Sequence, residues 1–212
     1  MERLNVLADV THPSLAKFFG EVCRDLEGHG HRTVIASRRK DRTTDLLDRD
    51  GLRHIVVSRT FDRGMAGLAS ELLVRVIRLI RLIRRHNIDV VLTRSPAGCI
   101  AGRMAGAKVI FDTDDGLGAG IHHSLAAPFA HVITSPEWLT DDLGVRHHRY
   151  RSLKSLAYLH PARFTPDPHV RRDFGVPDSQ PIFVLRRSAY SASHDVGHGG
   201  IDDALARAVI ER

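Results

Sequence analysis

The sequence has almost no cysteine, which excludes a fold held together by disulfides. Cys23 and Cys99 are the only two thiols and lie far apart in apolar surroundings, as expected of core residues in a reducing compartment. No stretch approaches the roughly 18 uninterrupted apolar residues of a membrane-spanning helix. Residues 1–3 lead directly into a short apolar strand, without the long apolar region of a signal peptide. We therefore expect a cytoplasmic protein.

Missing motifs exclude two further classes of protein. The segment after the first apolar run, residues 9–14, lacks the G-x-G-x-x-G pattern that lets the backbone approach a pyrophosphate, so an NAD-type dehydrogenase is not expected. Histidine is plentiful, with 14 residues, but the pairs His122-His123 and His147-His148 lack the ligand spacing of a zinc site and are interpreted as loop residues. The sequence therefore predicts no cofactor, and its histidines predict no metal ligands.

Acidic residues are outnumbered by basic ones. The 31 Lys and Arg residues against 25 Asp and Glu give a formal charge of +6, and only four of the basic residues are lysines. An arginine-rich surface suits anionic partners such as phosphate groups, acidic lipids or nucleic acid. The length of 212 residues is enough for one domain or one and a half.

Short apolar runs and helical periodicities alternate along the first 143 residues. Strands are expected at residues 4–10, 33–37, 54–58, 88–93, 108–112 and 131–134. Helices are expected at residues 15–27, 43–50, 65–86, 97–106, 125–130 and 137–143. This alternation predicts an α/β fold, a Rossmann-like parallel sheet with helices on both faces. In such sheets ligands bind outside the carboxyl ends of the strands, so the loops that follow them are the places to search.

The pattern changes after residue 143. Residues 156–159 are interpreted as a short strand, and 161–180 as a proline-rich linker. Residues 181–185 read as a new strand, followed by a polar loop and a helix that starts near Ile201. The expected organisation is a Rossmann-like N-terminal domain over residues 1–160, a linker over 161–180 and the incomplete start of a second domain over 181–212.

One expected helix carries a row of arginines between leucines and isoleucines. Arg75, Arg78, Arg81 and Arg84-Arg85 recur every three residues. The row suits a sheet-packing helix with a solvated edge. It also suits a basic amphipathic helix in peripheral contact with an anionic membrane, at its inner face, through Arg75–Arg85. No recognised nucleic-acid motif accompanies the charge, so no nucleic-acid partner is expected.

Two loops after strands place polar side chains at helix starts. Thr11, His12 and Ser14 follow the first strand. Ser14 suits a helix cap, and the free backbone amides at the helix start suit an anion. His12 suits a general base or an ordinary loop residue. Arg94 and Ser95 follow the fourth strand, where they suit either a phosphate clamp or a cap beside a surface arginine.

Three carboxylates follow the fifth strand, at Asp112, Asp114 and Asp115. Carboxylates this close repel one another unless a cation, an arginine or a proton lies between them. The segment therefore suits a Mg²⁺ or Mn²⁺ site, an acid/base residue beside a group that binds sugar hydroxyls, or the capping of a helix in a polar loop.

The stretch after residue 185 is the most distinctive. A strand ends at Arg186, and a polar loop with His194-Asp195 and Gly199-Gly200 leads into a helix. This is the layout of a phosphate-binding strand–turn–helix unit, although the His-Asp pair suits a purely local contact as well.

Five motifs are weak singly but together cover nearly the whole chain. They are Thr11-His12-Pro13 with Phe18-Phe19, Gly28-His29-Gly30-His31, Phe111-Asp112-Thr113-Asp114, Ala157-Tyr158-Leu159-His160-Pro161 with Arg163-Phe164, and Leu185-Arg186 with His194-Asp195 and Gly199-Gly200. In this order they resemble an uncharacterised prokaryotic group, domain-of-unknown-function family 354.

The family is similar to the GT-B superfamily of glycosyltransferases and nucleotide-sugar 2-epimerases. That resemblance implies two Rossmann-like domains, the first taking a hydroxyl acceptor and the second most of a nucleotide-sugar donor. His12, Arg94, Asp112, Asp114, Arg186, His194 and Asp195 fall at motif positions. Family members continue through a complete second domain, so the chain is expected to be truncated and its catalysis is in doubt. The alternative is a non-catalytic module that binds an anionic ligand or a membrane surface.

Overall fold

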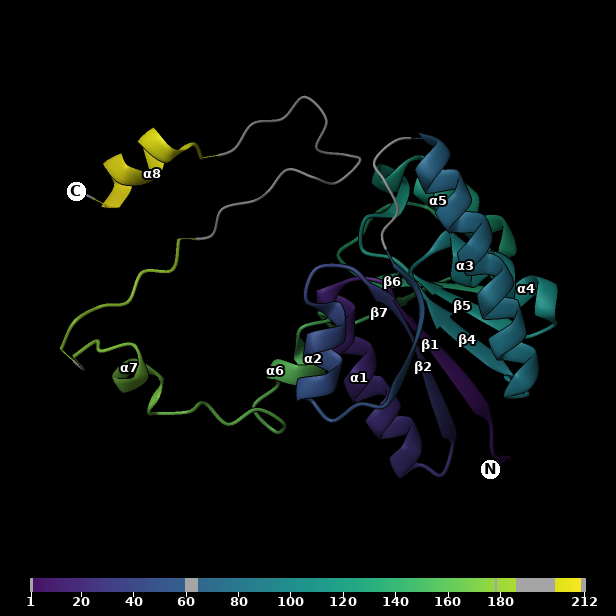
Figure 1. The fold of residues 1–212 in the computed structure, drawn as a ribbon, viewed down its shortest axis with the longest axis horizontal. Coiled ribbons are helices and arrows are strands. Elements are labelled where there is room, and N and C mark those ends of the chain that lie inside the picture. Colours follow the sequence, from purple (N-terminus) through teal and green to yellow (C-terminus); the bar gives the residue numbers. More distant parts are fainter. Residues whose placement is uncertain (1, 60–64, 178, 186–200, 211–212) are drawn as a thin grey trace. The chain divides into compact units, whose positions relative to one another are not determined.

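The computed structural model describes residues 2–59, 65–177, 179–185 and 201–210. The chain divides into two compact units, Met1–Phe164 and Thr165–Arg212. In the first unit, seven parallel strands form one sheet in the order β3-β2-β1-β4-β5-β6-β7 (Figure 1). The predicted Rossmann-like parallel sheet is confirmed.

The elements follow the expected alternation of strand and helix. The strands are β1 (Asn5–Val10), β2 (Arg32–Arg39), β3 (His54–Arg59), β4 (Val90–Thr93), β5 (Lys108–Asp112), β6 (Val132–Pro136) and β7 (His147–Tyr150). The helices are α1 (Pro13–Gly28), α2 (Thr43–Arg49), α3 (Met65–Arg85), α4 (Pro96–Ala105), η1 (Gly116–Ala119), α5 (Ile121–Ala126), η2 (Ala127–Phe129), α6 (Leu156–Leu159), α7 (Val170–Asp173) and α8 (Asp203–Ile210).

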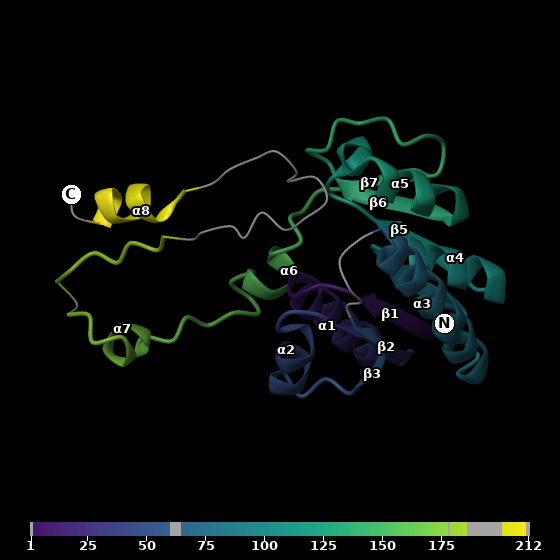
Figure 2. The same ribbon diagram turned by 45° about the horizontal axis from the view of Figure 1, so that its top comes forward.

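Helices cover both faces of the sheet (Figures 1 and 2). Successive side chains of a strand point to opposite faces. Leu7 of β1 therefore packs in the core under α3 and α4, whereas Ala8 packs with α1 and α2. Phe111 of β5 lies in a third core under α5 and η2.

Both thiols lie in these cores, as the sequence predicts. Cys23 is buried on α1 and Cys99 on α4. Burial raises the pKa of both, to about 12 for Cys23. Among the described helices, none is both long and apolar enough to cross a membrane.

Three predictions of local structure are wrong, and one strand was not predicted. Residues 147–150 form strand β7, which has no apolar pattern because it lies at the sheet edge with one neighbour. Residues 137–143 form no helix, since the Glu137 amide continues the ladder to Tyr150 O. The apolar run 156–159 is one helical turn, an ambiguity inherent in short apolar runs. Residues 181–185 form no strand, because the described part of their unit offers no strand to pair with.

The histidine pairs are corrected as well. His122-His123 belongs to α5 and His147-His148 to β7, so neither pair lies in a loop. His147 has a structural role, because its Nε2 atom lies 2.7 Å from the Ser135 hydroxyl on the neighbouring strand β6.

Candidate functional site

The strand order reverses between β1 and β4, which lie side by side with Asp9 in register with Thr93. The loop Thr11–Ser14 leaves one of these strands and the loop Arg94–Pro96 leaves the other, at the same edge of the sheet. This reversal is where open parallel sheets form their ligand crevices. The next loop along the edge, Asp112–Asp115, leaves β5.

A buried ion pair lies directly beneath this reversal. Asp9 is fully buried and pairs with Arg75 of α3. Arg75 also donates to the Ser58 hydroxyl at 2.6 Å. The other Asp9 oxygen accepts hydrogen bonds from Thr93, at 2.9 Å, and from Ser95. We refer to these five residues as the Asp9 network.

The Asp9 network corrects the interpretation of the arginine row. Arg75 is only 4% exposed and belongs to the core side of α3, not to a solvated edge or a membrane-facing surface. Glu71, one turn earlier, is also buried, and its Oε1 atom forms an ion pair with Arg38 Nε of β2 at 2.6 Å. Arg81, Arg84 and Arg85 are exposed, as the sequence predicts.

Ser95 has the capping role that was one of its two expected functions. Its hydroxyl accepts from Gly98 N at 3.0 Å at the start of α4, while it donates to Asp9. Gly98 is required by this packing, since a Cβ there would lie 2.2 Å from Thr93 Oγ1 and 2.6 Å from Asp9 Oδ2. Ser95 is therefore part of the structural support for the loop that carries Arg94.

The first loop is capped differently from the prediction. The N-cap of α1 is His12, not Ser14: His12 Nδ1 accepts from Ser14 N at 3.3 Å and lies 3.0 Å from Ser14 Oγ. Both side chains are exposed, and Thr11 before them is half-buried. The ring of His12 thus has a local structural partner, and its proposed role as a general base stays a prediction.

Arg94 draws the carboxylates of the fifth-strand loop together. Its guanidinium pairs with Asp114, lies 3.4 Å from Asp112 Oδ2 and lies 3.7 Å from Asp115. Lys154 pairs with Asp114 from the other side. We call Arg94, Asp112, Asp114 and Lys154 the Arg94 cluster. An arginine and a lysine thus supply the charge that three neighbouring carboxylates require.

Asp112 is the most deeply placed carboxylate of the Arg94 cluster. Its Oδ1 atom accepts from Thr134 at 3.1 Å and from the Tyr150 hydroxyl at 3.2 Å. Its Oδ2 atom is buried and accepts no hydrogen bond, and the facing Arg94 Nη1 atom donates none. Burial raises the pKa of Asp112 although Arg94, Thr134 and Lys154 act in the opposite direction. The two atoms face each other at 3.4 Å as an ion pair, and neither makes a hydrogen bond.

Lys154 and Tyr150 were missed by sequence reasoning. Burial and then the Arg94 charge lower the pKa of Lys154 to about 8, in spite of its ion pair with Asp114. Burial and the Asp112 carboxylate raise the pKa of Tyr150. No motif marks either residue, and Tyr150 ends the strand that the sequence pattern did not reveal.

Local hydrogen bonds fix the loop of Asp112–Asp115. The Thr113 hydroxyl accepts from Asp115 N at 3.3 Å and Gly116 N at 3.1 Å. Gly116 has a φ of +53°, and a Cβ there would lie 2.2 Å from Asp141 Oδ2. In the part of the chain that the structure describes, no three His, Cys, Asp or Glu residues are grouped as metal ligands.

Five predicted site residues lie outside the described residues: Arg186, His194, Asp195, Gly199 and Gly200. Their proposed contacts with a diphosphate stay predictions.

No family model and no curated protein matches the chain. Solved structures do. A glycosyltransferase from Rickettsia africae has a TM-score of 0.54 at 18% identity, over 85% of this chain and 52% of that one. MurG from Acinetobacter baumannii has a TM-score of 0.53 at 14% identity, over 66% and 43%. A putative UDP-N-acetylglucosamine 2-epimerase from Listeria monocytogenes has a TM-score of 0.53 at 13% identity, over 64% and 40%.

The matched part of this chain spans about half or less of the length of these proteins. Identities this low show a shared fold alone. They confirm the predicted likeness in fold to glycosyltransferases and nucleotide-sugar 2-epimerases, whereas membership of domain-of-unknown-function family 354 stays a prediction.

Proposed function

We propose that this chain provides part of the active site of an enzyme that acts on a nucleotide-activated sugar, as a glycosyltransferase or a nucleotide-sugar 2-epimerase. The observation that carries the proposal is the Arg94 cluster, at the carboxyl edge of the sheet beside the reversal of strand order. A guanidinium can bind phosphate oxygens, and groups with displaced pKa values in one cluster are typical of sites of proton transfer.

In this proposal each residue of the cluster has a separate role. Asp112, whose pKa is raised, accepts the proton of an acceptor hydroxyl; Asp114 and His12 are the other candidates for this base. Lys154, with a pKa of about 8, is partly neutral near physiological pH and can exchange a proton with the bound ligand. Arg94 supplies positive charge to a donor phosphate. Its side chain is 11% exposed, and Nη1, which faces Asp112 Oδ2 at 3.4 Å, reaches the ligand when that ion pair opens.

The remaining donor contacts are assigned to Arg186 and Gly199-Gly200, in the incomplete second domain proposed for residues 181–212. His194 and Asp195 complete that loop. Thr11 and Ser14 border the acceptor side at the start of α1. Because the chain spans at most about half of its structural neighbours, we propose that full activity requires further chain beyond these residues.

Calorimetry with UDP- and GDP-sugars tests the proposal. We expect saturable heat for at least one donor, and its loss in Arg94→Met, Asp112→Asn and Arg186→Ala. Asp45→Asn, an exposed carboxylate on α2, serves as the control and binds normally. Absence of heat with every nucleotide sugar, both here and in a longer chain with a complete second domain, contradicts the proposal.

A second candidate function is contact with an anionic membrane surface through α3. The observation that favours it is the exposure of Leu73 and Ile77, at 61% and 40%, on the helix that also exposes Arg81, Arg84 and Arg85. Sedimentation with vesicles that contain acidic lipid tests it, and Arg81→Gln/Arg84→Gln should lower binding. Binding that is absent, or unaffected by salt, contradicts it.

A further inference from the structure

Trp138 is the only tryptophan of the sequence, and 56% of its surface is exposed. Its backbone is nevertheless fixed on both sides. Glu137 N donates to Tyr150 O at 2.9 Å, and Leu139 N donates to Pro136 O at 3.1 Å. The side chain of Leu139 is buried. An ordered backbone therefore presents a large amphipathic ring to solvent, an arrangement more typical of recognition than of packing.

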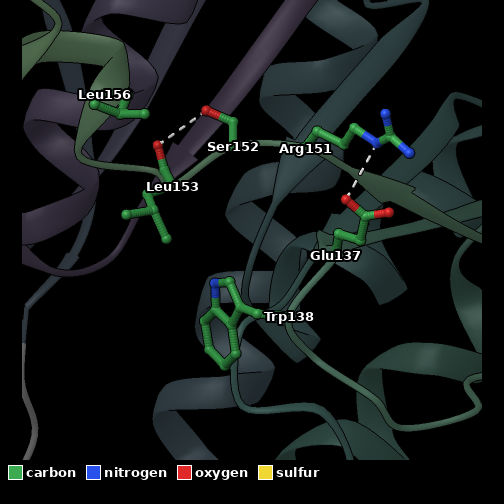
Figure 3. Close-up of a pocket in the computed structure, with 6 residues that line it drawn as sticks. All are labelled: Glu137, Trp138, Arg151, Ser152, Leu153 and Leu156. Atoms are coloured by element: carbon green, nitrogen blue, oxygen red, sulfur yellow. Dashed lines mark hydrogen bonds and ion pairs between the residues drawn. The ribbon is translucent and has the colours of Figure 1, made fainter.

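Trp138 borders a shallow hollow of about 480 Å³. The other lining residues are Glu137, Arg151, Ser152, Leu153 and Leu156, and we call the site the Trp138 hollow (Figure 3). The indole and the Leu153 side chain border the same space, and the Glu137–Arg151 ion pair forms another side. The volume lies in the range of small-ligand sites.

The chemistry of the Trp138 hollow fits a sugar ring. Trp138 and Leu153 offer an apolar surface to the C–H face of a pyranose. Arg151 Nε lies 3.3 Å from Glu137 Oε2, so donors and acceptors for ring hydroxyls stand side by side. The opposite charges of this pair cancel, which favours a neutral ligand over a phosphate or a carboxylate.

The hollow adjoins the Arg94 cluster. Tyr150 links them, because its carbonyl oxygen holds Glu137 and its hydroxyl donates to Asp112. A second hollow, of about 750 Å³, is lined by Tyr150 and Lys154 and shares four residues with the first: Arg151, Ser152, Leu153 and Leu156. A ligand that covers Trp138 can therefore extend to Lys154, the member of the Arg94 cluster that lines the second hollow.

We propose that the Trp138 hollow is a binding subsite for a neutral saccharide, with one ring stacked on Trp138 and its hydroxyls bound by Glu137 and Arg151. That this saccharide is the acceptor of the enzyme rests on the proposed function. That the hollow binds a saccharide does not depend on it.

Fluorescence of the single tryptophan provides the test. The whole chain is titrated with neutral mono- and disaccharides, including N-acetylglucosamine, glucose and mannose. We expect a saturable change in Trp138 emission, with millimolar dissociation constants. Glu137→Gln and Arg151→Gln should each weaken binding by about tenfold. Arg42→Gln is the matched control, because Arg42 is also an exposed arginine paired with a carboxylate and should leave binding unchanged.

Saturation-transfer NMR on the sugar protons provides a second readout that does not depend on the indole. Transfer should be lost in Trp138→Ala and retained in Leu125→Ala, an exposed leucine on α5. Circular dichroism of each variant establishes that it is folded.

Three results overturn the proposal. In the first, no neutral sugar of the panel gives a saturable signal in either assay. In the second, uridine or UDP changes the emission while neutral sugars do not, which makes the hollow a nucleotide site. In the third, the emission follows protein concentration while the mass doubles, which makes it an interface between copies. Saccharide binding with no nucleotide-sugar heat, either here or in a longer chain with a complete second domain, retains the subsite and rejects the proposed enzyme. The reverse result rejects the subsite alone.

Discussion

Two charged networks occupy neighbouring stretches of the same sheet edge and differ in their surroundings. Asp9 is fully buried, and both of its carboxylate oxygens accept hydrogen bonds, from Arg75 on one side and from Thr93 and Ser95 on the other. Asp112 is also buried, but its Oδ2 atom accepts no hydrogen bond. Its neighbour Lys154 is partly open to solvent, with 22% of the side chain exposed.

This difference suits the Asp9 network to a structural role and the Arg94 cluster to ligand binding. A buried carboxylate with every oxygen satisfied fixes the positions of α3, α4, β1 and β4, and it has no capacity left for a ligand. Each network holds one buried arginine nitrogen without a hydrogen bond, Arg75 Nε and Arg94 Nη1. The Arg94 cluster differs in that a carboxylate oxygen, Asp112 Oδ2, also lacks one and the pKa values of Asp112 and Lys154 are displaced. In the proposed function, the Asp9 network therefore supports the sheet edge at which the Arg94 cluster meets its ligand.

The largest expected effect comes from breaking the Asp9 network. Arg75→Met leaves a buried carboxylate without its cation and should lower the free energy of unfolding by about 3–5 kcal/mol. The double variant Asp9→Asn/Arg75→Met should recover part of this loss, because the amide oxygen still accepts from Thr93 and Ser95. Urea denaturation measures both values. Arg81→Met, an exposed position on the same helix, is the control. A loss below about 1 kcal/mol for Arg75→Met contradicts a supporting role.

Breaking the Arg94 cluster should cost less. Arg94→Met should lower the free energy of unfolding by about 1–3 kcal/mol at neutral pH, because Asp112 and Asp114 lose a cation but Lys154 stays. Removing Arg94 raises the pKa of Asp112 further. The folded protein then binds a proton more readily than the unfolded chain, so the deficit should shrink as the pH falls through that pKa.

Chemical denaturation at several pH values measures this change. The double variant Arg94→Met/Asp112→Asn has no carboxyl at the position and should lose the pH dependence. If the deficit of Arg94→Met is the same at acid and neutral pH, Asp112 is not the group that Arg94 stabilises.

The sequence places the loops that carry Arg94, Asp112 and Asp114 at one edge of the sheet for a simple reason. Each residue follows a buried strand, and the carboxyl ends of parallel strands share one edge. Lys154 and Tyr150 could not be found in this way. Tyr150 ends β7 and Lys154 follows it. The sequence of β7, His-His-Arg-Tyr, carries no alternation, because an edge strand paired on one side needs little apolar surface.

The Asp9 network escaped prediction because spacing does not reveal helical phase. Arginines every three residues form a continuous row on paper, but a helix turns once in about 3.6 residues, so the row drifts around the axis. Arg75 lies one turn after the buried Glu71, on the side that faces the sheet, whereas Arg81 and Arg84 have moved to solvent. The identity of the facing residue, Asp9, depends on the packing of α3 against β1.

A smaller effect should appear at alkaline pH. Because the pKa of Lys154 in the folded protein is about 8 against 10.5 for an ordinary lysine, the unfolded chain binds more protons between these values. The contribution of Lys154 to the free energy of unfolding therefore rises with pH through this window. The free energy of unfolding of the wild type should increase relative to that of Lys154→Met from about pH 8 to 10.5. Lys108→Met, an exposed lysine outside both networks, should show no such divergence from the wild type. Parallel pH curves for the wild type and Lys154→Met contradict the prediction.

The smallest effect on stability should come from substitutions at the exposed end of α3. These substitutions test whether the stabilising role of Arg75 extends to the other arginines of the same helix. Arg81→Gln/Arg84→Gln should change the free energy of unfolding by no more than about 0.5 kcal/mol, since neither side chain belongs to the Asp9 network. Thermal or urea denaturation measures this value beside that of Arg75→Met. A large gap between the two variants assigns stability to Arg75 and leaves the outer arginines free for a surface role. A loss comparable to that of Arg75→Met instead makes the whole arginine row structural, and it removes the reason to assign α3 to a membrane surface.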